Sequence, residues 1–157
     1  MTGFGGLLGF SGTIYHQLDE KSRVRIPSKF FPKAEGGAEL EDKTGKIFYF
    51  MAGSQGCISV YTREALEERL QKLLSIPDDN ADVVKAKRKI MGSIEEVETD
   101  KQGRTVVPAN LRALAKITKE LVSIGVGDHF EIWAKEEYDK NDLDMSYDRA
   151  NSIVGFF

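Results

Sequence analysis

The chain has 157 residues, a formal net charge of −3 and 41% hydrophobic residues. These values fit one or two small domains with a packed core and exclude a wholly disordered chain. A net negative charge disfavours nucleic-acid binding unless the cations gather on one surface. Cys57 is the single cysteine, which excludes an intramolecular disulfide and a cysteine-rich zinc site and is typical of a reducing, cytoplasmic location.

The N-terminal residues 1–11 are rich in glycine, and we predict that they form a flexible or subunit-contacting lead. Their short apolar run has no basic residues before it, so it does not resemble a secretory signal peptide. No stretch of the sequence approaches the roughly 18 apolar residues that cross a bilayer. We therefore expect a protein without a membrane partner.

Residues 12–18 alternate enough in polarity to predict a strand, which a turn at 19–22 follows. Val24 and Ile26 then alternate with arginines, which predicts a second short strand. Proline cannot donate to a strand ladder, so Pro27 ends this strand. We predict a short helix directly after it, over residues 28–33.

A glycine-rich acidic run at 34–46 separates this unit from two further predicted strands, 47–51 and 57–61. Thr62 has the residue type that caps a helix. Two amphipathic helices are predicted after it, with their apolar residues on one face: Leu66, Leu70, Leu73 and Leu74 in the first, then Val83, Val84, Ile90 and Met91 in the second.

The second half of the chain repeats the first. Each copy has an aspartate, an arginine four residues on and a proline four residues after that: Asp19, Arg23 and Pro27, then Asp100, Arg104 and Pro108. A second block, 49–61, aligns with 121–133 without a gap, and Gly53 falls on Gly125. Two matched blocks in the same order indicate a duplicated unit.

The repeat predicts four segments. Residues 12–64 are the first repeat, 65–92 a connecting helical hairpin, 93–136 the second repeat, and 137–157 a C-terminal helix and apolar tail. The C-terminal helix is predicted over residues 136–149. A unit of roughly 50 residues has a marginal core, so we expect the two halves to pack on each other or on other subunits.

The Asp-x-x-x-Arg units, each followed by Ile-Pro or Val-Pro, and the segment Phe130-Glu131-Ile132-Trp133 after Val126-Gly127-Asp128 resemble the MraZ family. The resemblance implies a mixed β fold with α-helices: tandem AbrB-like swapped-hairpin, double-psi-like β halves related by a pseudo-twofold axis and linked by a helical hairpin. It further implies a ring-forming, nucleoid-associated transcriptional regulator. MraZ proteins bind short direct repeats in double-stranded DNA upstream of the operon for cell-division and cell-wall genes, usually as repressors. The chain departs from the family at Ser22, where glycine is usual, in its extended N-terminus and in its acidic insert.

The candidate DNA contacts are the basic residues in and after the two turns: Lys21, Arg23, Arg25 and Lys29 in the first copy, and Lys101, Arg104 and Arg112 in the second. A guanidinium forms two parallel bonds to a phosphate or a carboxylate. Asp19 and Asp100 are expected to hold the turns and to orient the arginines. The alternative is a purely structural ion pair at the interface between repeats.

Catalysis, metal binding and scaffolding are the alternatives to DNA binding. Catalysis would rest on Cys57 with His16 or His129, and metal binding lacks ligand-like spacing, so we expect no enzyme, no small-molecule substrate and no cofactor. The helix cations Lys85, Lys87, Arg88 and Lys89 are either a second basic patch or an ordinary solvated face. A ring-forming scaffold without nucleic acid would use the apolar ends, Leu7-Leu8 and Phe156-Phe157.

Overall fold

The computed structural model describes residues 9–142 and 145–157, and the elements below belong to that part of the chain. The strands are β1 (Thr13–Gln17), β2 (Arg23–Arg25), β3 (Ile47–Ala52), β4 (Ile58–Tyr61), β5 (Glu95–Glu98), β6 (Arg104–Val106), β7 (Glu120–Gly125) and β8 (His129–Ala134). The α-helices are α1 (Arg63–Ser75), α2 (Ala81–Gly92), α3 (Ala109–Leu114), α4 (Lys135–Asp142) and α5 (Tyr147–Val154). Short 3-10 turns lie at Ser28–Phe30, Glu35–Gly37 and Ser54–Gly56.

The two halves of the chain exchange strands. The main sheet has six antiparallel strands in the order β1-β7-β8-β4-β3-β5. A pseudo-twofold axis between β8 and β4 relates β7 to β3 and β1 to β5. Strand β1 of the first half therefore pairs with β7 of the second half, and β5 of the second half pairs with β3 of the first. The predicted fold class, two swapped-hairpin β halves joined by a helical hairpin, is confirmed.

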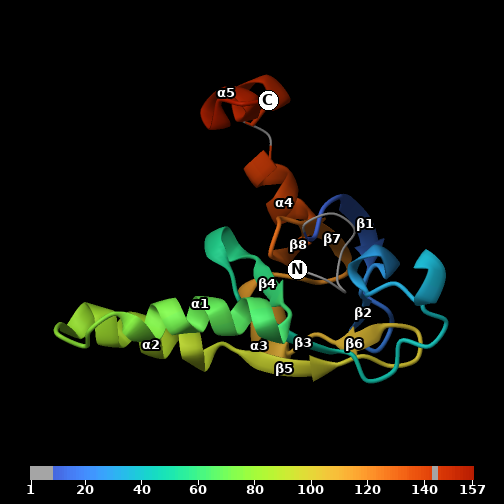
Figure 1. The fold of residues 1–157 in the computed structure, drawn as a ribbon, viewed down its shortest axis with the longest axis horizontal. Coiled ribbons are helices and arrows are strands. Elements are labelled where there is room, and N and C mark those ends of the chain that lie inside the picture. Colours follow the sequence, from blue (N-terminus) through green and yellow to red (C-terminus); the bar gives the residue numbers. More distant parts are fainter. Residues whose placement is uncertain (1–8, 143–144) are drawn as a thin grey trace.

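Strands β2 and β6 form a separate two-stranded antiparallel ribbon across the same axis. The helical hairpin α1–α2 extends from the opposite end of the molecule, so the ribbon and the hairpin tip lie far apart (Figure 1). Thr62 and Asn80 cap the two helices through their side chains, which accept N–H groups from the first turns. The ribbon and the hairpin are thus two distinct surfaces on one body.

An aromatic cluster fills the core between the halves. Phe30 and Phe130 have ring centroids 4.5 Å apart, and Phe48 lies 5.9 Å from Phe130. Phe10 also contacts Phe30, at 5.4 Å, and is only 2% exposed. The prediction of a loose lead over residues 1–11 is therefore wrong for Phe10, which is a core residue. Leu7 and Leu8 lie outside the described residues.

Backbone close approach explains Gly125 at the end of β7. A Cβ there would lie 2.3 Å from the backbone nitrogen of Ser11 and 2.4 Å from the carbonyl carbon of Phe10. The backbone amides of Phe10 and Gly127 also bond each other's carbonyl oxygens, at 2.7 and 2.9 Å. The segment before β1 is therefore held against the β7–β8 turn, where only glycine leaves enough room.

The C-terminal region differs from the single predicted helix over 136–149. It forms two helices, of which α4 docks on the sheet through Tyr138, whose ring lies 5.9 Å from that of Trp133. Ser146 starts α5 by accepting the Arg149 amide, and a left-handed Gly155 ends it. The short helix predicted over 28–33 is confined to a 3-10 turn at Ser28–Phe30. Within the described residues, no helix combines the length and apolar character that crossing a membrane requires.

Candidate nucleic-acid interface

The two Asp-x-x-x-Arg turns use the same geometry. Oδ1 of Asp19 accepts the backbone N–H groups of Lys21 and Arg23, both at 2.9 Å. Oδ1 of Asp100 accepts those of Gln102 and Arg104, also at 2.9 Å. An aspartate at the head of a tight turn satisfies donors that the turn would otherwise leave unpaired. Each carboxylate therefore fixes the turn that enters a ribbon strand.

The second oxygen of each carboxylate orients an arginine. Nε of Arg23 donates to Oδ2 of Asp19 at 2.7 Å, and Nε of Arg104 donates to Oδ2 of Asp100 at 2.9 Å. Nη1 of Arg23 also lies 3.8 Å from Oδ2 of Asp100, so the two turns meet across the pseudo-twofold axis. Both arginines are about three-quarters covered, at 25% and 27% side-chain exposure, and are thus held in one orientation.

These bonds keep both aspartates ionised. The backbone N–H of Arg23 is the main cause that lowers the pKa of Asp19, and the Arg23 side chain lowers it further. For Asp100, burial opposes ionisation, but the amide and side chain of Arg104 outweigh it and lower the pKa. Hydrogen bonds to the charged form favour that form. Each turn therefore holds its carboxylate in the charged state, beside an arginine.

The two turns differ at the position that needs a left-handed backbone. Gly103 has φ +78° and Ser22 has φ +58°. Ser22 therefore keeps the backbone that glycine has in the other copy, at the steric cost of a Cβ in that region. A Cβ on Gly103 would lie 3.0 Å from the Phe31 ring. Phe31 is buried and cannot retreat, which gives the second turn a packing reason for glycine.

The ribbon has one buried face and one outer face. Val24 and Thr105 point to the core, at 0% and 6% exposure. The flanking positions form the outer face: Arg23, Arg25, Arg104 and Val106. Arg25 lies opposite Arg104 in the strand register, and its guanidinium donates to Oε1 of Gln102 at 3.1 Å. This bond links the first half to the second turn and could not be foreseen from the repeat alignment.

The structure brings five of the seven predicted basic residues together on the ribbon and its turns. Lys21 and Lys101 are exposed on the two turns, beside the ribbon arginines. Lys29 lies on the 3-10 turn after β2, where its ammonium group sits over Gly12 before β1. Arg112 is half-buried on α3. Lys29 and Arg112 are therefore on other elements, away from the ribbon's outer face.

A second charged network, absent from the predictions, fastens the helical hairpin to the second half. Arg69 on α1 donates two bonds to Asp128, at 2.9 and 3.0 Å, and Nδ1 of His129 lies 2.8 Å from the same carboxylate. Tyr61 stacks on His129, with ring centroids 4.6 Å apart, and Arg69 covers the Tyr61 ring at 5.2 Å. Burial opposes ionisation of Asp128, but Arg69 outweighs it and lowers the pKa. The only sequence signal was Asp128 in the β7–β8 turn.

The structure gives Cys57 the environment of an inert thiol. Its side chain packs against Val122 and Trp133. Burial, followed by the nearby Glu131 carboxylate, raises the pKa of Cys57 to about 12. A reactive cysteine needs a lowered pKa and an electropositive setting. Among the described residues, no three His, Cys, Asp or Glu side chains are grouped as a metal site would need.

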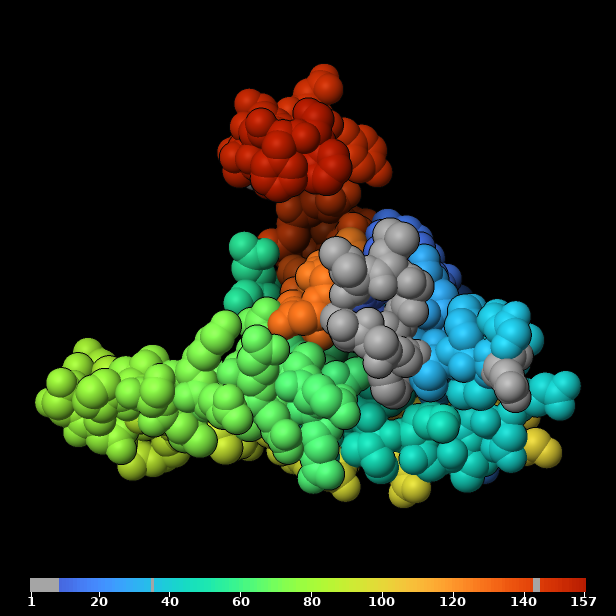
Figure 2. Space-filling model, viewed as in Figure 1, coloured from blue at the N-terminus to red at the C-terminus, as the bar shows by residue number. Residues whose placement is uncertain are grey.

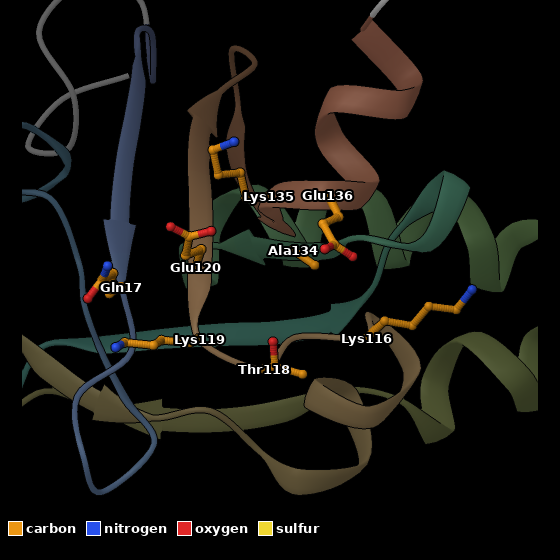
Figure 3. A pocket seen from close by; sticks show the side chains of 8 residues that line it. All are labelled: Gln17, Lys116, Thr118, Lys119, Glu120, Ala134, Lys135 and Glu136. Atoms are coloured by element: carbon orange, nitrogen blue, oxygen red, sulfur yellow. The ribbon is translucent and has the colours of Figure 1, made fainter.

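A shallow pocket of about 250 Å³ lies at the base of α4. Its lining mixes lysines and glutamates, and Lys116 and Lys119 point in opposite directions rather than toward a shared centre (Figure 3). Nζ of Lys135 is bonded to Asp139 at 2.9 Å, and Nζ of Lys116 lies 3.8 Å from Glu137. Binding pockets hold a few convergent polar groups, and this arrangement does not supply them.

Fold and site together define a class: a duplicated, strand-exchanged β protein that presents a basic two-stranded ribbon. Comparison with known proteins agrees with that class. The family model described as "MraZ protein, putative antitoxin-like" matches residues 90–147. Similar proteins include "Transcriptional regulator MraZ" of Clostridium acetobutylicum, 39% identical over 143 residues, covering 87% of this chain and 92% of the relative.

Two further relatives carry the same name. That of Lachnoclostridium phytofermentans is 34% identical over 145 residues, covering 92% of both chains. That of Moorella thermoacetica is 33% identical over 150 residues, covering 94% of this chain and 98% of the relative. The chain therefore belongs to the MraZ family. Its relatives are named as transcriptional regulators and not as enzymes, and the protein is of that kind.

Proposed function

We propose that this protein is a sequence-specific DNA-binding transcriptional repressor that uses the outer face of the β2–β6 ribbon. One observation carries the proposal: two paired strands place Arg23, Arg25 and Arg104 together on the outer face of the ribbon, with Arg25 the most exposed of the three. The major groove of B-DNA admits a two-stranded β-ribbon. Lys21 and Lys101 flank that surface from the two turns.

The turns prepare the arginines for this role. Each aspartate binds the Nε atom of its arginine. In the described part of the chain, the terminal nitrogens of Arg104 have no hydrogen-bond partner, and Arg23 places one of its own 3.8 Å from Asp100. A guanidinium group that is already oriented loses less side-chain entropy when it binds a phosphate or a guanine. Arg25 is exposed, and among the described residues its side chain bonds Gln102 alone, which makes it the freest of the three.

An acidic chain needs several copies of such a surface to bind DNA firmly. The ribbon and its turns hold five cations but also three carboxylates, Asp19, Glu20 and Asp100. We therefore propose a homo-oligomeric ring that binds short direct repeats upstream of a cell-division and cell-wall operon, in the nucleoid of the cytoplasm. Linked binding sites gain affinity when the spacing of the subunits matches that of the DNA repeats.

Fluorescence anisotropy tests this function. The full-length protein is titrated into a labelled fragment from upstream of its own gene and into a scrambled fragment, across a salt series. The proposal predicts tight binding to the native fragment alone, weakening steeply with salt because several phosphates are contacted. Equal affinity for both fragments would contradict sequence specificity.

One observation favours a second candidate, a scaffold that binds no nucleic acid. The C-terminal apolar residues are strongly exposed, with Tyr147 at 88%, Phe156 at 77% and Phe157 at 89%. Exposed apolar patches mark sites of contact with other proteins. An oligomer that binds neither fragment in the same titration would favour this scaffold.

A further inference from the structure

Helix α5 carries an apolar stripe that no other part of the described chain covers. Tyr147, Ala150 and Val154 lie at positions i, i+3 and i+7, and Ile153 borders them. All described residues from 145 to 157 are exposed except Ala150, which is half-buried. The C-terminal segment stands clear of the body, as its red end shows in Figure 2. Such spacing is that of an amphipathic helix that binds in a groove.

A groove of matching character lies between α2 and α3. It has a volume of about 550 Å³; its apolar floor is formed by Ala52, Leu111 and Leu114, and its rim by Lys85, Arg88 and Lys89. Leu114 is 59% exposed although it is apolar. Within the described residues, none of the three rim cations forms an ion pair. The groove therefore offers an apolar floor and unpaired positive charge together.

Two acidic residues near the C-terminus complement the positive charge of this rim. Asp142 ends α4 and Asp148 lies in the first turn of α5, and neither forms an ion pair in the described part of the chain. Two other grooves, on either side of α1, lack this complementarity. Arg69 in the first is bonded to Asp128, and Arg63 in the second lies 3.4 Å from Glu67.

The occupant must come from another copy of the chain. Helix α5 stands at the opposite side of the body from α2 and α3 (Figure 1), so α5 does not reach the groove of its own chain. An anionic membrane surface is a poorer partner, because it would repel Asp142 and Asp148. We infer that α5 of one copy docks in the α2–α3 groove of a second copy, with its acidic side toward Lys85, Arg88 and Lys89.

This contact joins two different surfaces and is therefore heterologous. Heterologous contacts generate a closed ring when their rotation closes and a filament when it does not. The inference thus rests on the self-association in the proposed function and supplies one interface for it. DNA binding through the ribbon is separate, since β2 and β6 take no part in the contact.

Site-directed crosslinking tests the docking directly. Leu114→Cys and Val154→Cys are made in separate full-length chains, mixed and oxidised, and the products are separated on a non-reducing gel. A product of twice the chain mass in the mixture, and not in either variant alone, is the expected result. A product from Val154→Cys alone would mean that α5 pairs with α5 and would overturn the inference, as would the lack of any product. Wild type, with its buried Cys57, is the control.

Charge-reversal variants test the same contact a second way. Light scattering measures the mass of the assembly that each variant forms. Asp148→Lys and Arg88→Glu should each raise the concentration for half-assembly roughly 10-fold, corresponding to one lost ion pair near an apolar contact. The double variant should return to within about 3-fold of wild type. If the double variant instead assembles more weakly than either single variant, because the two losses add, the inference is wrong. A wild-type protein that is monomeric would contradict the proposed oligomer itself, whereas an intact oligomer without crosslinking would contradict only this interface.

Discussion

Arg23 of the first half lies 3.8 Å from the carboxylate of Asp100 in the second half. Each residue belongs to its own Asp-x-x-x-Arg turn, and each turn leads into one strand of the basic ribbon. The two copies of the motif therefore form one site across the pseudo-twofold axis rather than two independent sites. Predictions about the turns follow from this arrangement.

Replacing Asp100 with alanine should lower stability. The change removes two backbone N–H acceptors and the partner of Arg104 Nε. Because Asp100 is 37% exposed, water replaces part of these bonds. We expect a loss of about 1 kcal/mol and a fall in Tm of about 2–4 °C, measured by thermal denaturation. Asp19→Ala should act in the same direction. An unchanged Tm in both variants would rule out this role for the aspartates.

Stability should also fall in acid because of these carboxylates. The pKa values of Asp19 and Asp100 are lowered in the folded protein relative to the ordinary value of 3.8. A group with a lowered folded pKa stabilises the protein above its unfolded pKa, and that contribution is lost as pH falls through the folded value. We expect the free energy of unfolding to decrease from about pH 5 downward.

The double variant Asp19→Asn, Asp100→Asn checks that assignment by urea denaturation at several pH values. Its free energy of unfolding should fall less steeply with acid than that of wild type. Glu39→Gln with Glu41→Gln, two exposed residues of the acidic insert, controls for the change in net charge. Identical slopes for wild type and the aspartate variant would show that the acid response arises elsewhere.

Substitutions at the left-handed position should change stability in opposite directions in the two turns. Ser22→Gly removes a Cβ from a left-handed backbone, which stabilises the folded protein. Because glycine also raises the conformational entropy of the unfolded chain, we expect a net gain of only about 0.5 kcal/mol in the free energy of unfolding. Gly103→Ala adds a Cβ 3.0 Å from the buried Phe31 ring and should cost about 1–3 kcal/mol. Urea denaturation measures both. Loss of stability on Ser22→Gly would show that the serine side chain contributes more than its backbone strain.

Arg69 should matter more than a neighbouring arginine on the same helix. Arg69→Ala removes two bonds to Asp128 and the contact with the Tyr61 ring, and since the pair is half-exposed we expect about 1 kcal/mol of destabilisation. Arg63→Ala is the matched control, because its pair with Glu67 is largely exposed and should contribute almost nothing. Equal Tm values for the two variants would contradict a fastening role for Arg69.

The repeat made much of this architecture predictable. The aligned turns placed Asp19 with Asp100 and Arg23 with Arg104, and the period-two pattern put Val24 inside. Contacts between the halves were not predictable, because no spacing within either copy indicates that Gln102 bonds Arg25.

Regions outside the repeat were harder to predict. Phe10 lies outside the two aligned blocks, and its place in the core depends on the β7–β8 turn against which it packs. Nothing in the acidic run 34–46 indicates that the Lys43 side chain packs over the Phe31 ring beside Gly103. The break between α4 and α5 carries a capping serine, Ser146, but no proline or glycine to mark it in the sequence. Tertiary contacts, rather than local propensity, decide these positions.

The most direct test of the central claim compares Arg25→Ala with Arg88→Ala. Arg25 is exposed on the ribbon, whereas Arg88 lies on α2 at the rim of the α2–α3 groove. Affinity for the upstream fragment is measured by anisotropy on samples at concentrations where light scattering shows each variant to be fully assembled. Arg25→Ala should weaken binding roughly 10-fold or more, and Arg88→Ala should leave it close to wild type. A greater loss with Arg88→Ala, or none with Arg25→Ala, would contradict the assignment of the ribbon as the DNA-binding surface.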